Sequence, residues 1–114
     1  MRTVSDTDLA AELPGLVSAE ATASPEGPRV VISGNFATPH AALAALDAAI
    51  PRYRLHALNA QPGLPQRDGV RWETAFVGPG MRGAEGLVYV PSRLSLVPRL
   101  FRSTCPPDVV VIHT

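Results

Sequence analysis

Lysine is absent from this chain, and cysteine is nearly so. All ten basic residues of the 114-residue sequence are arginine. A Schiff-base lysine and the phosphate-binding lysine of a P-loop are therefore excluded. The single cysteine, Cys105, excludes an internal disulfide and a zinc site built from several cysteines. Because two prolines follow Cys105, we expect it to be a small apolar residue in a loop.

Net charge is also lacking. Ten acidic residues balance the ten arginines, so we expect no nucleic acid and no anionic membrane surface as a partner. No apolar run approaches the ~18 residues that span a bilayer. The first residues include Asp6 and Asp8 rather than a basic segment before an apolar one, so no secretory signal is visible. These observations predict a soluble, cytoplasmic protein.

The three histidines do not have the spacing of metal ligands. His40 lies in the first turn of a predicted helix, His56 in a predicted strand and His113 next to the end of the sequence. We therefore predict no metal site, and we expect each histidine to be structural or exposed.

The most informative segment runs from Val30 to Pro39. Its three consecutive β-branched residues predict a strand buried on both faces. Gly34 then permits a tight turn. Thr38 is expected to cap a helix over residues 39–49, with Pro39 in its first position. This arrangement places a helix N-terminus at the carboxyl end of a strand, where open α/β sheets bind anionic or carbonyl-bearing ligands.

The remaining elements are predicted from periodicity and from turn residues. Residues 3–22 are weakly helical, with an interruption at Pro14-Gly15. Further strands are expected over residues 53–58, 70–77, 87–90 and 108–113. Alternation in the third strand assigns Trp72 and Phe76 to the core. A helix over residues 92–102 accommodates Pro98 in its first turn if Ser95 caps it.

This order predicts an α/β fold with an open, mostly parallel, Rossmann-like sheet. Residues 1–28 are expected to form an N-terminal helical segment and loop. Residues 29–114 are expected to form the first part of an α/β domain. The last predicted strand has Val-Val-Val-Ile at its centre, a pattern typical of a buried, central strand. The sequence ends directly after it. A parallel strand of this type needs cover and a partner at each edge, so we expect an incomplete domain.

Three segments resemble the amino-terminal domain of the acetyl-CoA hydrolase/transferase family, which includes 4-hydroxybutyrate and acetate CoA-transferases. They are Ser33-Gly34-Asn35-Phe36-Ala37-Thr38-Pro39, Phe76-Val77-Gly78-Pro79-Gly80-Met81-Arg82 and the segment from Tyr89 to Phe101. The last of these, Tyr-x-Pro-x-x-Leu-Ser-x-x-Pro-x-Leu-Phe, is the most specific. The resemblance covers residues 29–114.

The resemblance implies two related Rossmann-like domains with the active site between them. A glutamate of the carboxy-terminal domain attacks an acyl-CoA thioester. CoA then passes to a small carboxylate, or the acyl group passes to water. CoA is a substrate, and no cofactor is implied. No glutamate in this sequence matches the context of that nucleophile, so we expect no catalytic residue in this chain.

The roles that the resemblance carries to this chain are therefore pocket-lining. The candidate residues for binding CoA and substrate are Ser33, Gly34, Asn35, Phe36, Ala37, Thr38, Pro39, Gly80 and Arg82. Backbone N–H groups near Gly34 would stabilise the charge that forms on an attacked thioester carbonyl. Arg82 would pair with a carboxylate or a phosphate. An ordinary strand–helix connection and a solvated arginine are the alternatives.

We therefore expect the amino-terminal, pocket-forming part of a CoA-transferase or acyl-CoA hydrolase. It would be completed by a missing carboxy-terminal domain or by a homo-oligomer. Two alternatives stay open: one subunit of a split CoA-transferase, and a non-enzymatic α/β module that binds a CoA-like ligand or a partner protein. The sequence does not identify the acyl group or its acceptor.

Overall fold

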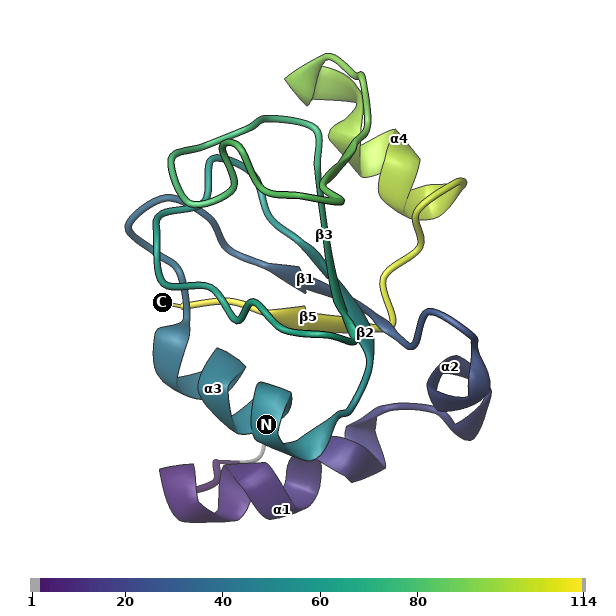
Figure 1. Ribbon diagram of the computed structural model, residues 1–114. Coiled ribbons are helices and arrows are strands. Elements are labelled where there is room, and N and C mark those ends of the chain that lie inside the picture. The colour runs from purple at the N-terminus through teal and green to yellow at the C-terminus, as the bar shows by residue number, and fades with distance from the viewer. Residues whose placement is uncertain (1–2, 114) are drawn as a thin grey trace.

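The computed structural model describes residues 3–113 as a small α/β domain. Its five strands form one all-parallel sheet in the order β4-β3-β2-β1-β5, which is compatible with a Rossmann-like fold. Figure 1 shows α1 and α3 packed together on one side of the sheet, with α4 far from both. The prediction of an open, parallel α/β sheet is confirmed at this level.

The centre of the fold is the predicted strand–helix–strand unit. β1 (Arg29–Ile32) and β2 (Tyr53–His56) pair in parallel, and α3 (His40–Ala49) connects them. On α3, Leu43 and Leu46 are fully buried and belong to the main core. Their spacing of three residues places them on one face of the helix, so α3 covers one face of the sheet.

The N-terminal residues form two helices, as expected, but the break between them was misplaced. α1 (Asp6–Leu16) contains Pro14, and α2 (Ala19–Ala23) follows it. The helical conformation is interrupted before α2, where Ser18 is the N-cap residue. The side chain of Ser18 accepts a hydrogen bond from the N–H of Ala21 and so starts the second helix. The apolar side of α1 packs against α3, so α1 and α3 lie on the same face of the sheet.

The second half of the chain supplies strands at both edges of the sheet. β3 (Val70–Thr74) and the short β4 (Val88–Tyr89) complete one edge, and β5 (Val109–Val111) forms the other. Between β4 and β5 lie a 3-10 turn, η1 (Leu94–Leu96), and the helix α4 (Val97–Arg102). Pro98 lies in the first turn of α4 as predicted, but no side chain caps either element, so the expected role of Ser95 is wrong.

Two predictions of burial are also wrong. β5 is an edge strand rather than a buried central one, and Val110 is 60% exposed. Phe76, assigned to the core by alternation, is 44% exposed. The strand ends at Thr74, so the two-residue period no longer fixes the direction of the Phe76 side chain. Trp72 lies within the strand and is buried as expected.

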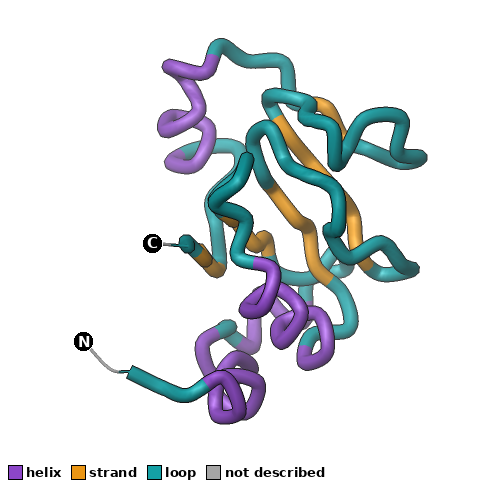
Figure 2. The backbone as a smooth tube through the Cα atoms, turned by 90° about the vertical axis from the view of Figure 1, so that its left-hand side faces the viewer, coloured by secondary structure: helices purple, strands orange, loops and turns teal. Residues whose placement is uncertain are grey.

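The opposite face of the sheet is polar. The register aligns Arg29 with Arg54 and Arg54 with Arg71, so three arginines lie side by side across β1, β2 and β3. In the same register His56 lies beside Glu73. Figures 1 and 2 both show α4 far from α1 and α3. Its Phe101 contacts His56, so α4 covers part of this face, which we call the polar face.

Candidate functional site

The predicted site residues come together at the carboxyl edge of the sheet. Three loops meet there: residues 33–39 after β1, residues 57–61 after β2 and residues 75–82 after β3. We call them the carboxyl-edge loops. Backbone hydrogen bonds join the first loop to the second, from Asn35 N–H to Asn59 O (2.9 Å), and the second to the third, from Asn59 N–H to Phe76 O (2.9 Å). The three loops therefore form one connected layer beyond the strands.

Glycines allow this close approach. A Cβ atom on Gly34 would lie 1.7 Å from the carbonyl oxygen of Leu58. On Gly78 and Gly80 it would meet the backbone of residues 59–61 at 2.4 Å and 2.1 Å. Side chains are thus excluded at all three positions by the neighbouring loop. The motifs Ser-Gly-Asn and Gly-Pro-Gly, picked out in the sequence, are the places where backbone packs on backbone.

The turn after β1 presents Phe36 to solvent. Asn35 has a φ of 53°, in the left-handed region that asparagine tolerates better than most residues. Its side-chain oxygen accepts a hydrogen bond from Gln61 Nε2 at 3.3 Å. Phe36 is 88% exposed, and among residues 3–113 its backbone N–H has no hydrogen-bond partner. The turn therefore offers a free donor beside an exposed aromatic ring.

The hydroxyl groups of this loop have structural roles. Ser33 Oγ donates to the carbonyl of Ala37 (2.5 Å) and accepts from the N–H of His113 (3.1 Å). Thr38 Oγ1 donates to the carbonyl of Asn35 (2.8 Å). Thr38 therefore closes the turn instead of capping α3, and that prediction is wrong. Pro39 is the N-cap residue of α3, one position before the one expected.

Gly80 and Arg82 occupy the third loop. Gly80 N–H donates to Ala60 O at 2.7 Å, which fastens this loop to the second one. Arg82 is exposed, and its guanidinium has no partner within the described residues, 3–113. The structure thus places all nine predicted site residues at one edge, although Thr38 and Pro39 are buried under the turn.

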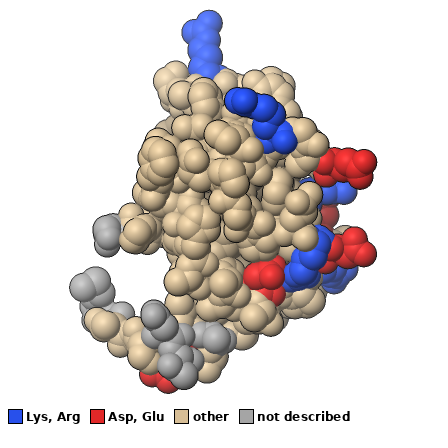
Figure 3. Space-filling view, turned by 60° about the vertical axis from the view of Figure 1, so that its left-hand side comes forward, with Lys and Arg blue, Asp and Glu red and all other residues tan. Residues whose placement is uncertain are grey.

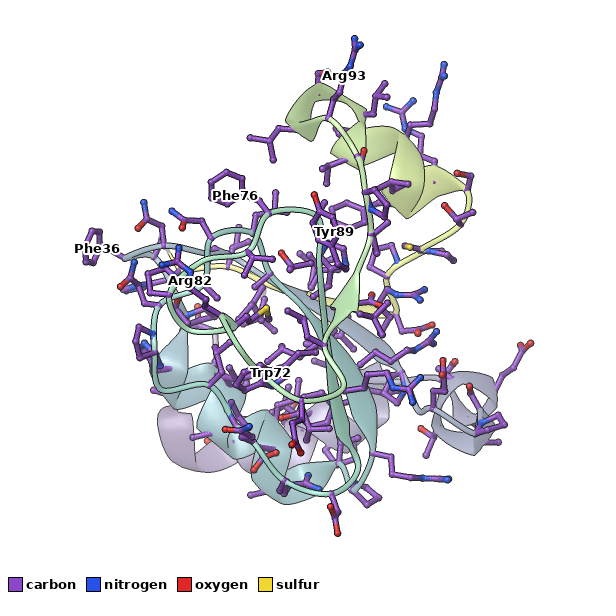
Figure 4. The ribbon with its side chains drawn as sticks, turned by 45° about the horizontal axis from the view of Figure 1, so that its top comes forward. Phe36, Trp72, Phe76, Arg82, Tyr89 and Arg93 are labelled. Carbon is purple, nitrogen blue, oxygen red and sulfur yellow. The ribbon has the colours of Figure 1, made fainter. Side chains whose placement is uncertain are left out.

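The surface around these loops is apolar and poor in charge. In Figure 4 the ring of Phe36 projects away from the protein, and Phe76 and Arg82 lie on the same side of the view. Figure 3, which brings the carboxyl-edge loops forward, shows a face that is mostly uncharged, with separate basic side chains at its top and a mixed cluster of acidic and basic side chains at its right-hand side. Phe76 and Ile112 are 44% and 65% exposed. Such a surface is typical of a contact site for a ligand or another protein.

A hollow of about 500 Å³ lies at the opposite, amino-terminal edge of β2 and β3 rather than at the carboxyl-edge loops. Its charged lining residues are Glu26, Arg52, Arg67, Asp68, Arg71 and Glu85. Several of them already pair with each other or with neighbouring groups, since Arg71 binds Glu26 (2.9 Å) and Arg67 binds Asp47 (3.0 Å). None of the nine predicted site residues lines this hollow.

Two features of the site were missed in the sequence. Asn59 and Gln61 lie in the loop after β2 and contact the Asn35 turn. They were discoverable, because carboxyl ends of neighbouring parallel strands meet at one edge. The second feature is a buried network of Arg29, His56 and Glu73 on the polar face. In this network Arg29 and His56 both contact the same carboxylate oxygen of Glu73.

The part of the chain that the structure describes contains neither a cluster of candidate metal ligands nor a helix that could span a membrane. Within residues 3–113, no three side chains of the histidine, cysteine, aspartate and glutamate types are grouped to hold a metal ion. No described helix is long and apolar enough to cross a bilayer. No family model matches the chain, and neither a curated protein nor a solved structure matches it.

Proposed function

We propose that this chain is the amino-terminal, pocket-forming part of an acetyl-CoA hydrolase or CoA-transferase, with a Rossmann-like domain that a further domain completes. Its substrates would be an acyl-CoA and a small carboxylate, or water in place of the carboxylate. CoA is a substrate, and the chain needs no cofactor. The attacking glutamate would lie outside this chain, and the protein would act in the cytoplasm.

The observation that carries this proposal is the unpaired N–H of Phe36 in a turn that is fixed on both sides. The turn is bonded to Asn59 and is closed by Thr38. When a thioester carbonyl is attacked, its oxygen gains negative charge, and a preorganised N–H stabilises that charge. The unpaired guanidinium of Arg82 is available for a phosphate or carboxylate group of the substrate.

The exposed apolar residues support a partner on the same side. Phe36 and Phe76 belong to the carboxyl-edge loops, Ile112 directly follows β5, and all three side chains are exposed. Exposed apolar patches mark contact sites in soluble proteins. A carboxy-terminal domain, on the same chain or on a separate subunit, would cover this surface and bring the glutamate to the substrate.

A binding module without turnover is the second candidate. No aspartate or glutamate occurs in residues 33–39, 57–61 or 75–82. These loops therefore contain no carboxylate nucleophile or base. Such a module would bind a CoA-like ligand or a partner protein through the same apolar surface.

The test is a titration of the purified chain with acetyl-CoA, followed by amide NMR. We expect saturable shifts of the amide signals of residues 33–38, 80 and 82, and no thioester hydrolysis. Arg82→Gln should weaken binding, whereas Arg93→Gln, an exposed arginine on another segment, should not. No binding of acetyl-CoA would contradict the proposal. Hydrolysis that is abolished by a change at Asn35 would contradict the external glutamate.

A further inference from the structure

A buried charged network occupies the polar face of the sheet. Arg29 Nε donates to Glu73 Oε1 at 2.5 Å, and His56 Nδ1 lies 3.1 Å from the same oxygen. His56 is fully buried and Glu73 is 4% exposed. The two faces of a parallel sheet are normally covered by apolar side chains. A buried polar network in that position is costly unless all its members are paired.

The contact with Glu73 makes Nδ1 of His56 a hydrogen-bond donor. Burial raises the pKa of Glu73, but hydrogen bonds from His56 and Arg29, together with the positive charge of Arg29, outweigh this effect and lower that pKa to about 2. Glu73 is therefore ionised near neutral pH, and a carboxylate only accepts hydrogen bonds. It follows that Nδ1 of His56 is the donor. In the neutral ring, Nε2 is left as an acceptor.

That acceptor is unused. His56 Nε2 is a buried atom without a hydrogen-bond partner among residues 3–113. The ring of Phe101 lies against the imidazole, with 5.0 Å between the ring centroids and an interplanar angle of 76°. Leaving a buried polar atom without a hydrogen-bond partner destabilises a folded protein. The unpaired atom therefore calls for a ligand that the described residues do not supply.

The element that covers this atom is weakly held. α4 has six residues, and no side chain caps its N-terminus. Phe101 itself is only partly buried. Figures 1 and 2 show α4 away from the packed pair α1 and α3. Short helices with few tertiary contacts open locally at low free-energy cost.

We propose that His56 Nε2 is the hydrogen-bond acceptor of a small-ligand site on the polar face, which Phe101 covers and a local opening of α4 exposes. The ligand is a small neutral molecule with an O–H or S–H donor. His56 is the last residue of β2, so the site lies near the edge where open parallel sheets bind ligands. This inference stands apart from the proposed function, because it uses neither the carboxyl-edge loops nor CoA.

The charges around His56 select a neutral ligand. The ionised Glu73 disfavours an anion, and the guanidinium of Arg29 beside it disfavours a cation. Arg54, two residues before His56 on β2, adds positive charge, but its guanidinium is bound to Glu26 and to the carbonyl of Gly27. A metal ion is not indicated either, because no group of three candidate ligands exists within the described residues.

The test is 15N NMR of the imidazole nitrogens during titration with 2-mercaptoethanol, which carries both donor groups. The control compound is 1,2-dimethoxyethane, which has no donor. We expect Nε2 of His56 to be unprotonated and its resonance to shift in a saturable way with 2-mercaptoethanol only. His40 and His113, both exposed, report nonspecific effects in the same spectrum.

Two variants test the role of Phe101. Phe101→Ala should increase the affinity of His56 for 2-mercaptoethanol several-fold, whereas Leu16→Ala, at an exposed position on α1, should leave it unchanged. A protonated Nε2 or an unresponsive one in the unaltered chain would overturn the proposal. A response confined to Phe101→Ala would also overturn it, because α4 would then never uncover the atom. The unaltered chain decides the matter even if Phe101→Ala fails to fold.

Discussion

Asn35 and Asn59, which lie on different loops, are joined by a backbone hydrogen bond of 2.9 Å and share an unusual conformation. Their φ angles are 53° and 50°, and they are the non-glycine residues with positive φ among residues 3–113. Residues held in this region cluster at functional sites, where the surrounding structure maintains them. The bond couples the turn that presents Phe36 to the loop after β2.

The first prediction concerns this pair. Asn59→Ala should lower the free energy of unfolding by about 1 kcal/mol, because alanine tolerates the left-handed region poorly. Asn59→Gly should cost less, since glycine adopts positive φ freely. Denaturant unfolding of both variants measures the difference. Equal losses would show that the side chain of Asn59, and not its backbone conformation, matters.

The second prediction compares two glycines. Gly34→Ala should destabilise the fold strongly, because its Cβ atom would lie 1.7 Å from a backbone oxygen that cannot move alone. Gly15→Ala is the matched control, since Gly15 lies in α1 and has no atom within 4 Å of its Cβ position. It should stabilise the helix by about 0.5–1 kcal/mol. Thermal melts distinguish the two, and a harmless Gly34→Ala would disprove the tight contact with Leu58.

The third prediction is a loss of stability in acid. The pKa of Glu73 is lowered from its ordinary value of 4.5 to about 2 in the folded chain. A carboxyl group with a depressed pKa stabilises the fold above its unfolded value, and this contribution is lost as pH falls from 4.5 towards 2. The full loss is about 3 kcal/mol. Urea unfolding at several pH values between 2 and 6 measures it.

Glu73→Gln is the control for this titration. The variant should be less stable near neutral pH, because the buried guanidinium of Arg29 loses its counter-charge. It should also lose most of the pH dependence between 4.5 and 2. If the variant keeps the full acid sensitivity, other carboxyl groups cause it and the pairing of Glu73 is not responsible.

The strand–helix–strand unit was predictable because local signals agreed there. The run of β-branched residues, the glycine turn and the apolar spacing of the next helix all indicate one structure. The same reasoning pointed to residues 33–39, whereas Gly80 and Arg82 were chosen from the family resemblance alone. The sequence did not reveal that Thr38 would close the turn, because a threonine before a helix has two competing backbone partners, and the choice depends on the position of Asn35.

The missed features depend on contacts that are distant in sequence. Arg29 and Glu73 are 44 residues apart, so their pairing follows only from the strand order. The burial of β5 was overestimated for the same reason. A run of valines predicts a strand, but whether it lies at the centre or at the edge depends on the crossover from β4 to the far side of β1.

The last prediction concerns the apolar surface at the carboxyl edge. If the chain self-associates through the apolar surface proposed above as a contact site, Phe36→Ser reduces that association, measured by light scattering after size-exclusion chromatography. Its stability should stay within about 0.5 kcal/mol of the unaltered chain, since exposed side chains contribute little to folding. Leu16→Ser is the control, because Leu16 is 65% exposed on α1, outside the carboxyl-edge loops. If both variants change association equally, general surface hydrophobicity drives it. A selective effect of Phe36 would instead locate the contact at the turn that Asn35 and Asn59 hold in place.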